Sequence, residues 1–193
     1  SYRRDGVGYF GDKARQVFVT PVPVKTPSDN LKPASWQVTS GSYNHGMPAI
    51  SPCGRYLVTS VRRSDTADYD QKSDLWLWDL ETKSSYWLYD GPGPIWDVIW
   101  SPDGRTLAFS GHDFSHNVST TTDLWLLDVS DWLERLAQGE PLQPLQMAQA
   151  KNVTRPFDRP FGAHSGAELR YGGSNMFWQG PELYFLMSER GAA

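Results

Sequence analysis

The feature that most constrains the fold is a block of sequence that occurs twice, about fifty residues apart. The segment from Ile50 to Ser60 recurs from Trp100 to Ser110 with the same Ser-Pro-x-Gly-Arg centre. A second block, Ser73 to Leu80, recurs at nearly the same spacing as Thr122 to Val129. Two blocks that repeat in step indicate a repeat architecture, in which each unit packs on the next.

Each Ser-Pro-x-Gly centre predicts a type I turn between two antiparallel strands. Proline presets φ at the second position of the turn, and glycine accepts the positive φ that follows. The flanking segments Ile95 to Trp100 and Thr106 to Ser110 are rich in β-branched and aromatic residues and lack helical periodicity. Cys53 stands where the second copy has Asp103, and we expect the turn to tolerate it.

Two further strands complete the unit. Asp123 to Val129 is almost continuously apolar, as expected for a strand covered on both faces, and Ser85 to Tyr89 is a candidate fourth strand. Four antiparallel strands in about fifty residues are the unit of a β-propeller blade. The sequence therefore predicts an all-β fold, a segment of a β-propeller with about three to four four-stranded blades in an incomplete ring.

The predicted division is a partial blade at 1–42, a blade at 43–92, a blade at 93–169 with a long connection, and a partial blade at 170–193. A short helix is expected in the long connection of the blade at 93–169, because Asp131 and Glu134 have capping-box spacing and Gly139 can end a helix. Both ends of the chain are expected to be truncated within a larger propeller.

Composition excludes several classes of function. Eighteen Lys and Arg stand against 22 Asp and Glu, and no run of like charge exceeds Arg62-Arg63, so we expect neither a nucleic-acid partner nor a membrane surface. Apolar runs are far shorter than the roughly twenty residues of a membrane span. The single cysteine, Cys53, cannot form an internal disulfide, which favours a reducing compartment and predicts a cytoplasmic protein.

The repeated motifs resemble a known family. Ser101-Pro102-Asp103-Gly104-Arg105 with the strand that follows, then Asp123 to Asp128, resemble the propeller repeat shared by TolB-like proteins and the prolyl oligopeptidase family of serine peptidases. Three further segments, Tyr2 to Tyr9, Thr154 to Asp158 and Leu183 to Gly191, resemble segments of acylaminoacyl-peptidase-like propellers, in this order.

The resemblance implies a two-part hydrolase, with an N-terminal propeller and a C-terminal α/β-hydrolase domain that carries Ser, Asp and His. This chain matches only the propeller and contains no G-x-S-x-G nucleophile motif, so no catalytic residue is assigned to it. The implied partners are that missing domain of the same polypeptide and a peptide substrate, with a homo-oligomer possible. The alternative is a non-catalytic TolB-like propeller that binds a protein partner, and the shared repeats leave it open.

The candidate site lies in the loops. When strands alternate in direction, the loop between the second and third strands of a blade lies on the same propeller face as the connection to the next blade. These loops carry a mixed-charge set suited to docking another domain or holding peptide termini. The candidate substrate or interdomain contacts are Arg62, Arg63, His112, Asp113, His164, Glu168 and Arg170, and Arg155 belongs to the wider set.

Metal and cofactor sites are not predicted. His112 and His116 are spaced as in a zinc-protease helix, but Gly111 and a polar run around them predict a loop. Tryptophans recur at equivalent blade positions, Trp76 with Trp125 and Trp100 with Trp178, which predicts packing between blades for these side chains.

Overall fold

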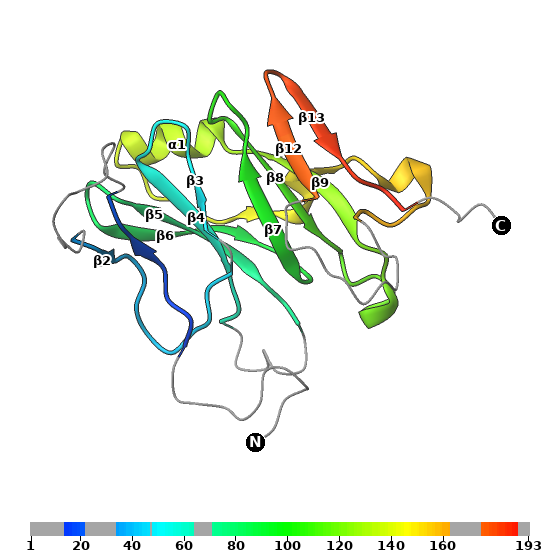
Figure 1. The fold of residues 1–193 in the computed structure, drawn as a ribbon, viewed down its shortest axis with the longest axis horizontal. Coiled ribbons are helices and arrows are strands. Elements are labelled where there is room, and N and C mark those ends of the chain that lie inside the picture. Colours follow the sequence, from blue (N-terminus) through cyan, green and yellow to red (C-terminus); the bar gives the residue numbers. More distant parts are fainter. Residues whose placement is uncertain (1–13, 22–33, 47, 64–70, 163–174, 189–193) are drawn as a thin grey trace, which may run out of the picture.

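The computed structural model describes residues 14–21, 34–46, 48–63, 71–162 and 175–188. These residues form strands in four sheets, one α-helix and three short 3-10 turns (Figure 1). The strands are β1 (Phe18–Val19), β2 (Trp36–Gln37), β3 (Ala49–Ile50), β4 (Tyr56–Val61), β5 (Asp74–Asp79), β6 (Ser84–Asp90), β7 (Ile95–Trp100), β8 (Thr106–Gly111), β9 (Asp123–Asp128), β10 (Leu145–Gln146), β11 (Ala150–Asn152), β12 (Met176–Gln179) and β13 (Glu182–Phe185). The helical elements are α1 (Ser130–Ala137), η1 (Asn117–Ser119), η2 (Met147–Gln149) and η3 (Arg155–Phe157).

Two four-stranded antiparallel blades form the centre of the molecule. In the first blade the order is β3-β4-β5-β6, and in the second it is β7-β8-β9-β11. Strands β4, β5 and β6 pair with antiparallel neighbours, as do β7, β8 and β9. The predicted all-β propeller segment is confirmed, and the described sheets form no closed ring. The residue limits given above for the individual blades stay predictions.

The two Ser-Pro-x-Gly turns have the predicted geometry. Gly54 donates its N–H to the carbonyl of Ser51 and Gly104 to that of Ser101, each at 2.9 Å. Both glycines have positive φ, 77° and 70°. The replacement of aspartate by Cys53 therefore leaves the backbone of the turn unchanged.

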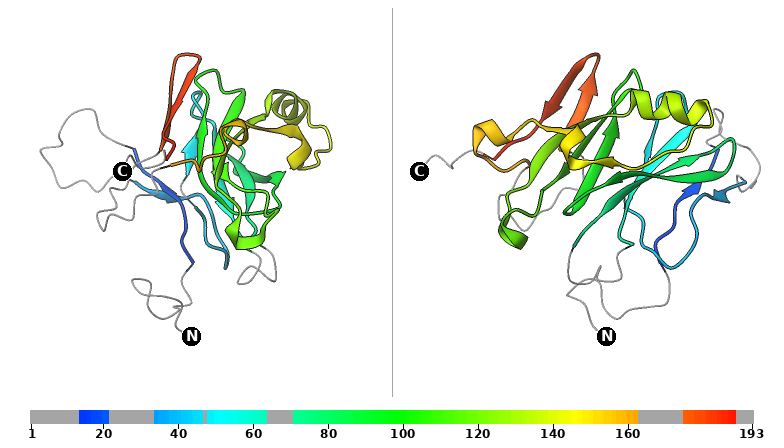
Figure 2. Two further views of the ribbon diagram at one scale, coloured as in Figure 1. Left: turned by 90° about the vertical axis from the view of Figure 1, so that its right-hand side faces the viewer. Right: turned by 180° about the vertical axis from the view of Figure 1, so that it is seen from behind.

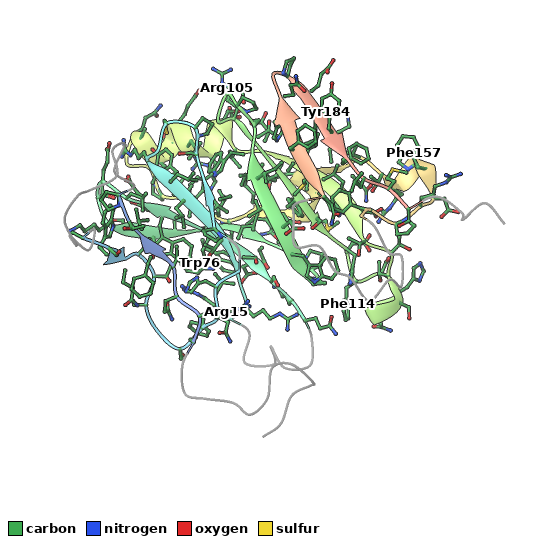
Figure 3. The ribbon with its side chains drawn as sticks, in the orientation of Figure 1. Arg15, Trp76, Arg105, Phe114, Phe157 and Tyr184 are labelled. Atoms are coloured by element: carbon green, nitrogen blue, oxygen red, sulfur yellow. The ribbon has the colours of Figure 1, made fainter. Side chains whose placement is uncertain are left out.

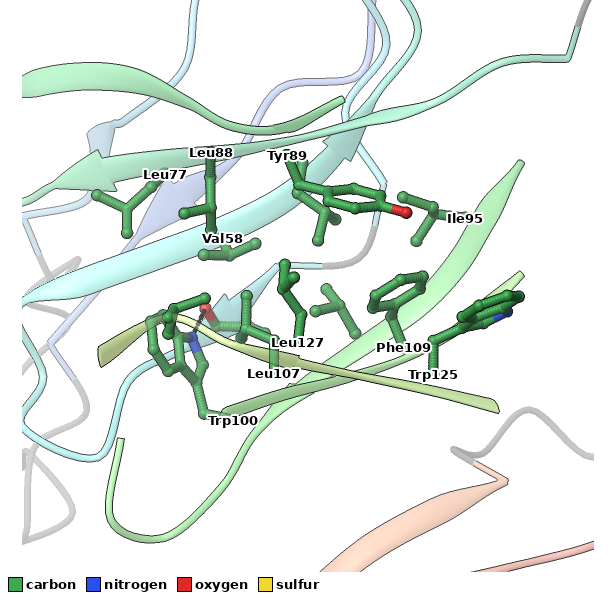
Figure 4. Packing of buried hydrophobic residues seen from close by; sticks show 14 of the residues in the cluster. Val58, Leu77, Leu88, Tyr89, Ile95, Trp100, Leu107, Phe109, Trp125 and Leu127 are labelled. Carbon is green, nitrogen blue, oxygen red and sulfur yellow. Dashed lines mark hydrogen bonds between the residues drawn. The ribbon is translucent and has the colours of Figure 1, made fainter. Parts of the chain in front are cut away.

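The core lies between the sheets, which stack face to face. Leu77 and Leu88 of the first blade meet Leu107 and Leu127 of the second, and all four side chains are fully buried (Figure 4). The indole of Trp100 donates a hydrogen bond of 3.1 Å to the carbonyl of Ala49 across the same layer. This confirms the inter-blade packing predicted for Trp100.

Two smaller layers lie on the outer faces of the blades. Val17, Leu57, Val61 and Trp78 form one between β1 and the first blade. Ala108, Leu124, Phe161 and Met176 form the other between the second blade and the β12–β13 hairpin. The view from behind shows the resulting succession of sheets, with β1–β2 at one end and β12–β13 at the other (Figure 2, right). Each blade is thus covered on both of its faces.

The connection that carries α1 differs from expectation in two ways. The helix begins at Ser130 rather than after Asp131, and Asp128 Oδ1 accepts a 2.9 Å hydrogen bond from the N–H of Ser130. The predicted capping box is wrong, because Asp128, the last residue of β9, already accepts a hydrogen bond from the first helical N–H. Beyond the helix, β10 pairs parallel to the outer strand β6 of the first blade, so the connection of one blade protects the edge of the other.

Candidate functional site

The loops between second and third strands gather at one end of the two blades. Val61 at the end of β4 pairs with Asp74 at the start of β5, and Gly111 at the end of β8 pairs with Asp123 at the start of β9. The link from β6 to β7 lies at the same end, where the N–H of Ser73 donates to the carbonyl of Gly93 at 3.1 Å. We call this end the loop face. It lies below the sheets in Figure 1, opposite α1, and Figure 3 places Phe114 there and Arg105 on the other side.

Two glycines allow the loops to approach each other closely on the loop face. A Cβ on Gly93 would overlap the carbonyl oxygen of His112, and one on Gly111 would overlap that of Pro94. Neither oxygen can yield without moving the backbone. The link between the blades is therefore held directly against the base of the β8–β9 loop.

Asp123 organises a polar cluster at the end of the second blade. Its carboxylate accepts hydrogen bonds from the Thr154 hydroxyl at 2.9 Å and from the Asn152 carboxamide at 2.7 Å. The Arg155 guanidinium lies 3.8 Å from the same carboxylate and 2.5 Å from Asp113. We call these five residues the Asp123 cluster. It ties the segment after β11 to the β8–β9 loop.

Two candidate residues, His112 and Asp113, adjoin the Asp123 cluster in different roles. The His112 ring is buried between Trp96 and Phe114, with ring centroids 5.6 and 5.7 Å away, and burial lowers its pKa. Desolvation raises the pKa of Asp113, but hydrogen bonds from Ser115 and Arg155 outweigh it, and the pKa falls to about 2. At neutral pH the pair is thus a neutral imidazole beside an ionised carboxylate.

The first blade carries a pocket of about 270 Å³ on the loop face, which we call the Asp74 pocket. Its lining residues are Arg63, Lys72, Asp74, Trp76 and Trp87. The guanidinium of Arg63 lies 3.5 Å from the ring centre of Trp76. The Trp76 and Trp87 rings are nearly parallel, at an angle of 7° with centroids 6.4 Å apart. Cross-strand pairing of β5 and β6 thus builds a flat aromatic wall with a cation on it.

Asp74 is the most unusual side chain of this pocket. It is 9% exposed; its carboxylate accepts a backbone hydrogen bond from Gly91, but no described residue donates one to its Oδ1. Burial raises the pKa of Asp74 to about 6, and the nearby Lys72 only partly offsets the effect. The Lys72 ammonium is itself paired with Asp90 at 2.6 Å.

The structure places four of the seven predicted site residues. Arg62 and Arg63 follow β4, and His112 and Asp113 follow β8, so all four lie on the loop face. They fall into separate clusters, because Arg63 lines the Asp74 pocket while Asp113 joins the Asp123 cluster. His164, Glu168 and Arg170 lie outside the described residues. The substrate or interdomain roles of all seven stay predictions.

Sequence reasoning missed Lys72, Asp74, Trp76 and Trp87. Trp76 was assigned to packing between blades because it recurs as Trp125, and it does pack in the layer between β1 and the first blade, but it is only half buried and also lines the pocket. The repeat itself held a usable signal. It places Asp74 and Asp123 at equivalent positions, at the start of a mostly apolar strand, where a buried aspartate needs a hydrogen-bond partner.

The described residues contain no group of three or more His, Cys, Asp or Glu side chains that could hold a metal ion. In the same part of the chain, no helix has the length and apolar character needed to cross a membrane.

One known protein shares sequence with part of this chain. A stretch of 77 residues is 34% identical to YuxL, an uncharacterized peptidase of Bacillus subtilis (strain 168). The match spans 40% of this chain but only 10% of that protein. No family model matches the chain. The chain is a propeller segment with a peptidase relative.

Solved structures with a similar arrangement include propellers of peptidases and of TolB. The putative TolB of Agrobacterium tumefaciens matches with a TM-score of 0.43 and 17% identity, over 62% of this chain and 36% of that one. The β-propeller domain of the trilobed protease of Pyrococcus furiosus matches with a TM-score of 0.39 and 21% identity, over 70% and 34%. The acylaminoacyl peptidase of Pyrococcus horikoshii matches with a TM-score of 0.38 and 16% identity, over 69% and 20%.

Proposed function

We propose that this chain is part of the propeller of a serine peptidase of the prolyl oligopeptidase type, which cleaves short peptides as acylaminoacyl or dipeptidyl peptidases do. The observation that carries the proposal is the 34% identity with a peptidase over 77 residues. The catalytic serine, aspartate and histidine belong to an α/β-hydrolase domain of the same polypeptide. The propeller segment contributes no catalytic residue.

In this proposal the loop face meets the catalytic domain and limits which peptides reach it. The face carries ion pairs that cross between segments, above all Arg155 with Asp113 at 2.5 Å. Loops held by such charge-assisted bonds resist opening. A rim of this kind admits short or unfolded peptides and excludes folded proteins.

The first experiment tests whether the parent protein is a serine peptidase. The full-length polypeptide is assayed with chromogenic aminoacyl and acylaminoacyl substrates, with and without a serine-directed inhibitor. We expect hydrolysis that the inhibitor abolishes. A protein that hydrolyses none of these substrates, and that the inhibitor does not label, would instead be the non-catalytic binding propeller.

A second experiment tests the gating role of the loop face. Arg155→Ala removes the pair with Asp113, so we expect hydrolysis of long peptides to rise severalfold relative to a blocked dipeptide. Arg135→Ala is the matched control, because Arg135 forms a similar exposed ion pair with Glu140 at 2.7 Å in the last turn of α1, on the side of the blades opposite the loop face. Equal length preference in wild type and both variants would argue against gating by this face.

A further inference from the structure

The Asp74 pocket has a counterpart within the same chain. Asp74 and Trp76 occupy the same places in the first copy of the repeated block as Asp123 and Trp125 in the second. An arginine lies over the indole in both copies, Arg63 at 3.5 Å from the ring centre of Trp76 and Arg155 at 5.6 Å from that of Trp125. The second copy therefore shows which partners this arrangement needs.

In the second copy the polar groups are satisfied from within the chain. Two neutral groups donate hydrogen bonds to the Asp123 carboxylate, the Asn152 carboxamide at 2.7 Å and the Thr154 hydroxyl at 2.9 Å. The indole N–H of Trp125 donates to the carbonyl of Gly111 at 3.2 Å. No external group is needed there.

In the first copy the equivalent atoms lack partners. Asp74 Oδ1, Trp76 Nε1 and Arg63 Nε are buried, and none has a hydrogen bond within the described chain. Buried polar groups in native proteins nearly always have a partner, and leaving one unpaired is costly. Three such atoms, all on residues that line one pocket, indicate that a ligand completes the site.

Charge and size narrow the chemistry of this ligand. Lys72 is paired with Asp90 at 2.6 Å, which leaves Arg63 and Asp74 as one cation and one anion in the pocket. Their opposite charges offset each other, so a charged ligand gains little net attraction to repay its desolvation, whereas a neutral group that both donates and accepts suits both. The volume of about 270 Å³ is near the lower end for small-molecule sites.

We propose that the Asp74 pocket binds a neutral amide, the backbone unit of a peptide. The amide N–H donates to the Asp74 carboxylate, as the Asn152 carboxamide does to Asp123, and the amide carbonyl accepts from the guanidinium of Arg63. The torsion of an aspartate carboxylate is broad, so Asp74 can turn its unpartnered oxygen to the ligand. An adjoining apolar side chain lies on Trp87, which is 39% exposed. The choice of a peptide as the source of the amide rests on the proposed function.

The test compares three leucine derivatives that differ in net charge, each of which keeps at least one amide. N-acetylleucinamide is neutral, leucinamide is a cation and N-acetylleucine is an anion. Binding to the full-length polypeptide is measured by saturation-transfer NMR at pH 7, where most Asp74 is ionised and most leucinamide is protonated. The protein is first treated with a serine-directed inhibitor, so that no probe is consumed at a catalytic site. We expect N-acetylleucinamide to bind at least fivefold more tightly than either charged probe.

Matched variants assign the binding to this pocket. Asp74→Asn is expected to weaken binding of N-acetylleucinamide about tenfold, because a hydrogen bond to a charged group is lost. Asp123→Asn changes the equivalent residue of the second copy and should leave the affinity within twofold of wild type. Trp178→Phe removes another buried unpartnered indole N–H, outside the pocket, and should also leave it unchanged.

The outcomes separate this inference from the proposed function. Tighter binding of a charged probe, absence of binding by all three, or a folded Asp74→Asn protein with wild-type affinity would each overturn the amide site. Far-UV circular dichroism shows whether the variants fold. Arg63→Lys, which keeps the charge but removes the guanidinium, is a second variant for which we expect the same loss of affinity for N-acetylleucinamide. None of these measurements depends on hydrolysis, so a protein without peptidase activity can still have the site.

Discussion

At the residue scale, the two Ser-Pro-x-Gly turns differ by one side chain. In the second turn Asp103 Oδ1 accepts from the Ser101 hydroxyl at 2.6 Å and from the N–H of Arg105 at 3.0 Å. In the first turn only the weaker acceptor Cys53 Sγ is present, 3.2 Å from the Ser51 hydroxyl. Cys53→Asp should therefore raise the melting temperature by about 2 °C. Calorimetry checks this, with Cys53→Ala as the control, and equal melting of the two variants would contradict it.

His45 makes folding stability depend on pH. Burial, and then the charge of Arg63, lower the pKa of His45 from 6.5 to about 4. Between these values the unfolded chain binds a proton that the folded protein does not. The contribution of His45 is thus complete above pH 6.5 and is lost as the pH falls towards 4.

His45→Gln tests this dependence, because glutamine does not titrate. Wild type should lose about 2 kcal/mol more of its free energy of unfolding than the variant does between pH 8 and pH 5. The raised pKa of Asp74 acts in the opposite direction, since it favours the folded state as the pH falls, but it is common to both proteins. Urea titrations at the two pH values give the difference, and parallel losses would show that His45 is not the source.

At the element scale, the link between β6 and β7 sets how closely the two blades pack. A methyl group at Gly93 would overlap the backbone carbonyl of His112. Gly93→Ala should therefore cost about 2–4 kcal/mol of the free energy of unfolding, as backbone must move to relieve the overlap. Its exposed neighbour provides the control, because Pro92→Ala meets no such contact. Urea titrations with similar midpoints for both variants would exclude a close approach at this link.

The sequence predicted those elements whose signal is local and repeated. Strands β4 and β8 follow directly from turn chemistry and β-branched residues on either side of a Ser-Pro-x-Gly centre. Strand β10 could not be predicted, since Leu145 and Gln146 have no copy elsewhere and become a strand only by pairing with β6. The start of α1 was misplaced for a similar reason, because the oxygen that accepts from the first helical N–H, that of Ser130, belongs to Asp128 of the preceding strand.

The candidate site was predictable only in part, for the same physical reason. The alternation of strand direction places Arg63 and Asp113 on one face, and the structure has both there. The repeat also marks Asp74 as equivalent to Asp123. The repeat does not predict the hydrogen-bond partners of these aspartates. Asn152 and Thr154 come from β11 and the segment just after it, whereas in the described part of the first blade no donor reaches Asp74 Oδ1.

At the scale of the whole molecule, the described sheets form a row, and the sheets at both of its ends carry exposed aromatic side chains. Phe18 and Trp36 on β1–β2 are 61% and 47% exposed, and Phe177 and Tyr184 on β12–β13 are 58% and 43% exposed. The rings of Phe177 and Tyr184 stack on each other at 5.3 Å and form a flat aromatic surface. Such surfaces and the sheet edges beside them favour association between chains.

The 193-residue chain should therefore self-associate through β12–β13. We expect sedimentation velocity to show species larger than a monomer at micromolar concentration, and the double variant Phe177→Thr with Tyr184→Thr to shift the distribution towards monomer. Phe157→Ser removes an aromatic side chain of similar exposure, 55%, from η3 rather than from a sheet, and should leave the association unchanged. A monomeric chain would contradict this prediction. If Phe157→Ser has the same effect as the double variant, the aromatic surface of this hairpin is not the contact between chains.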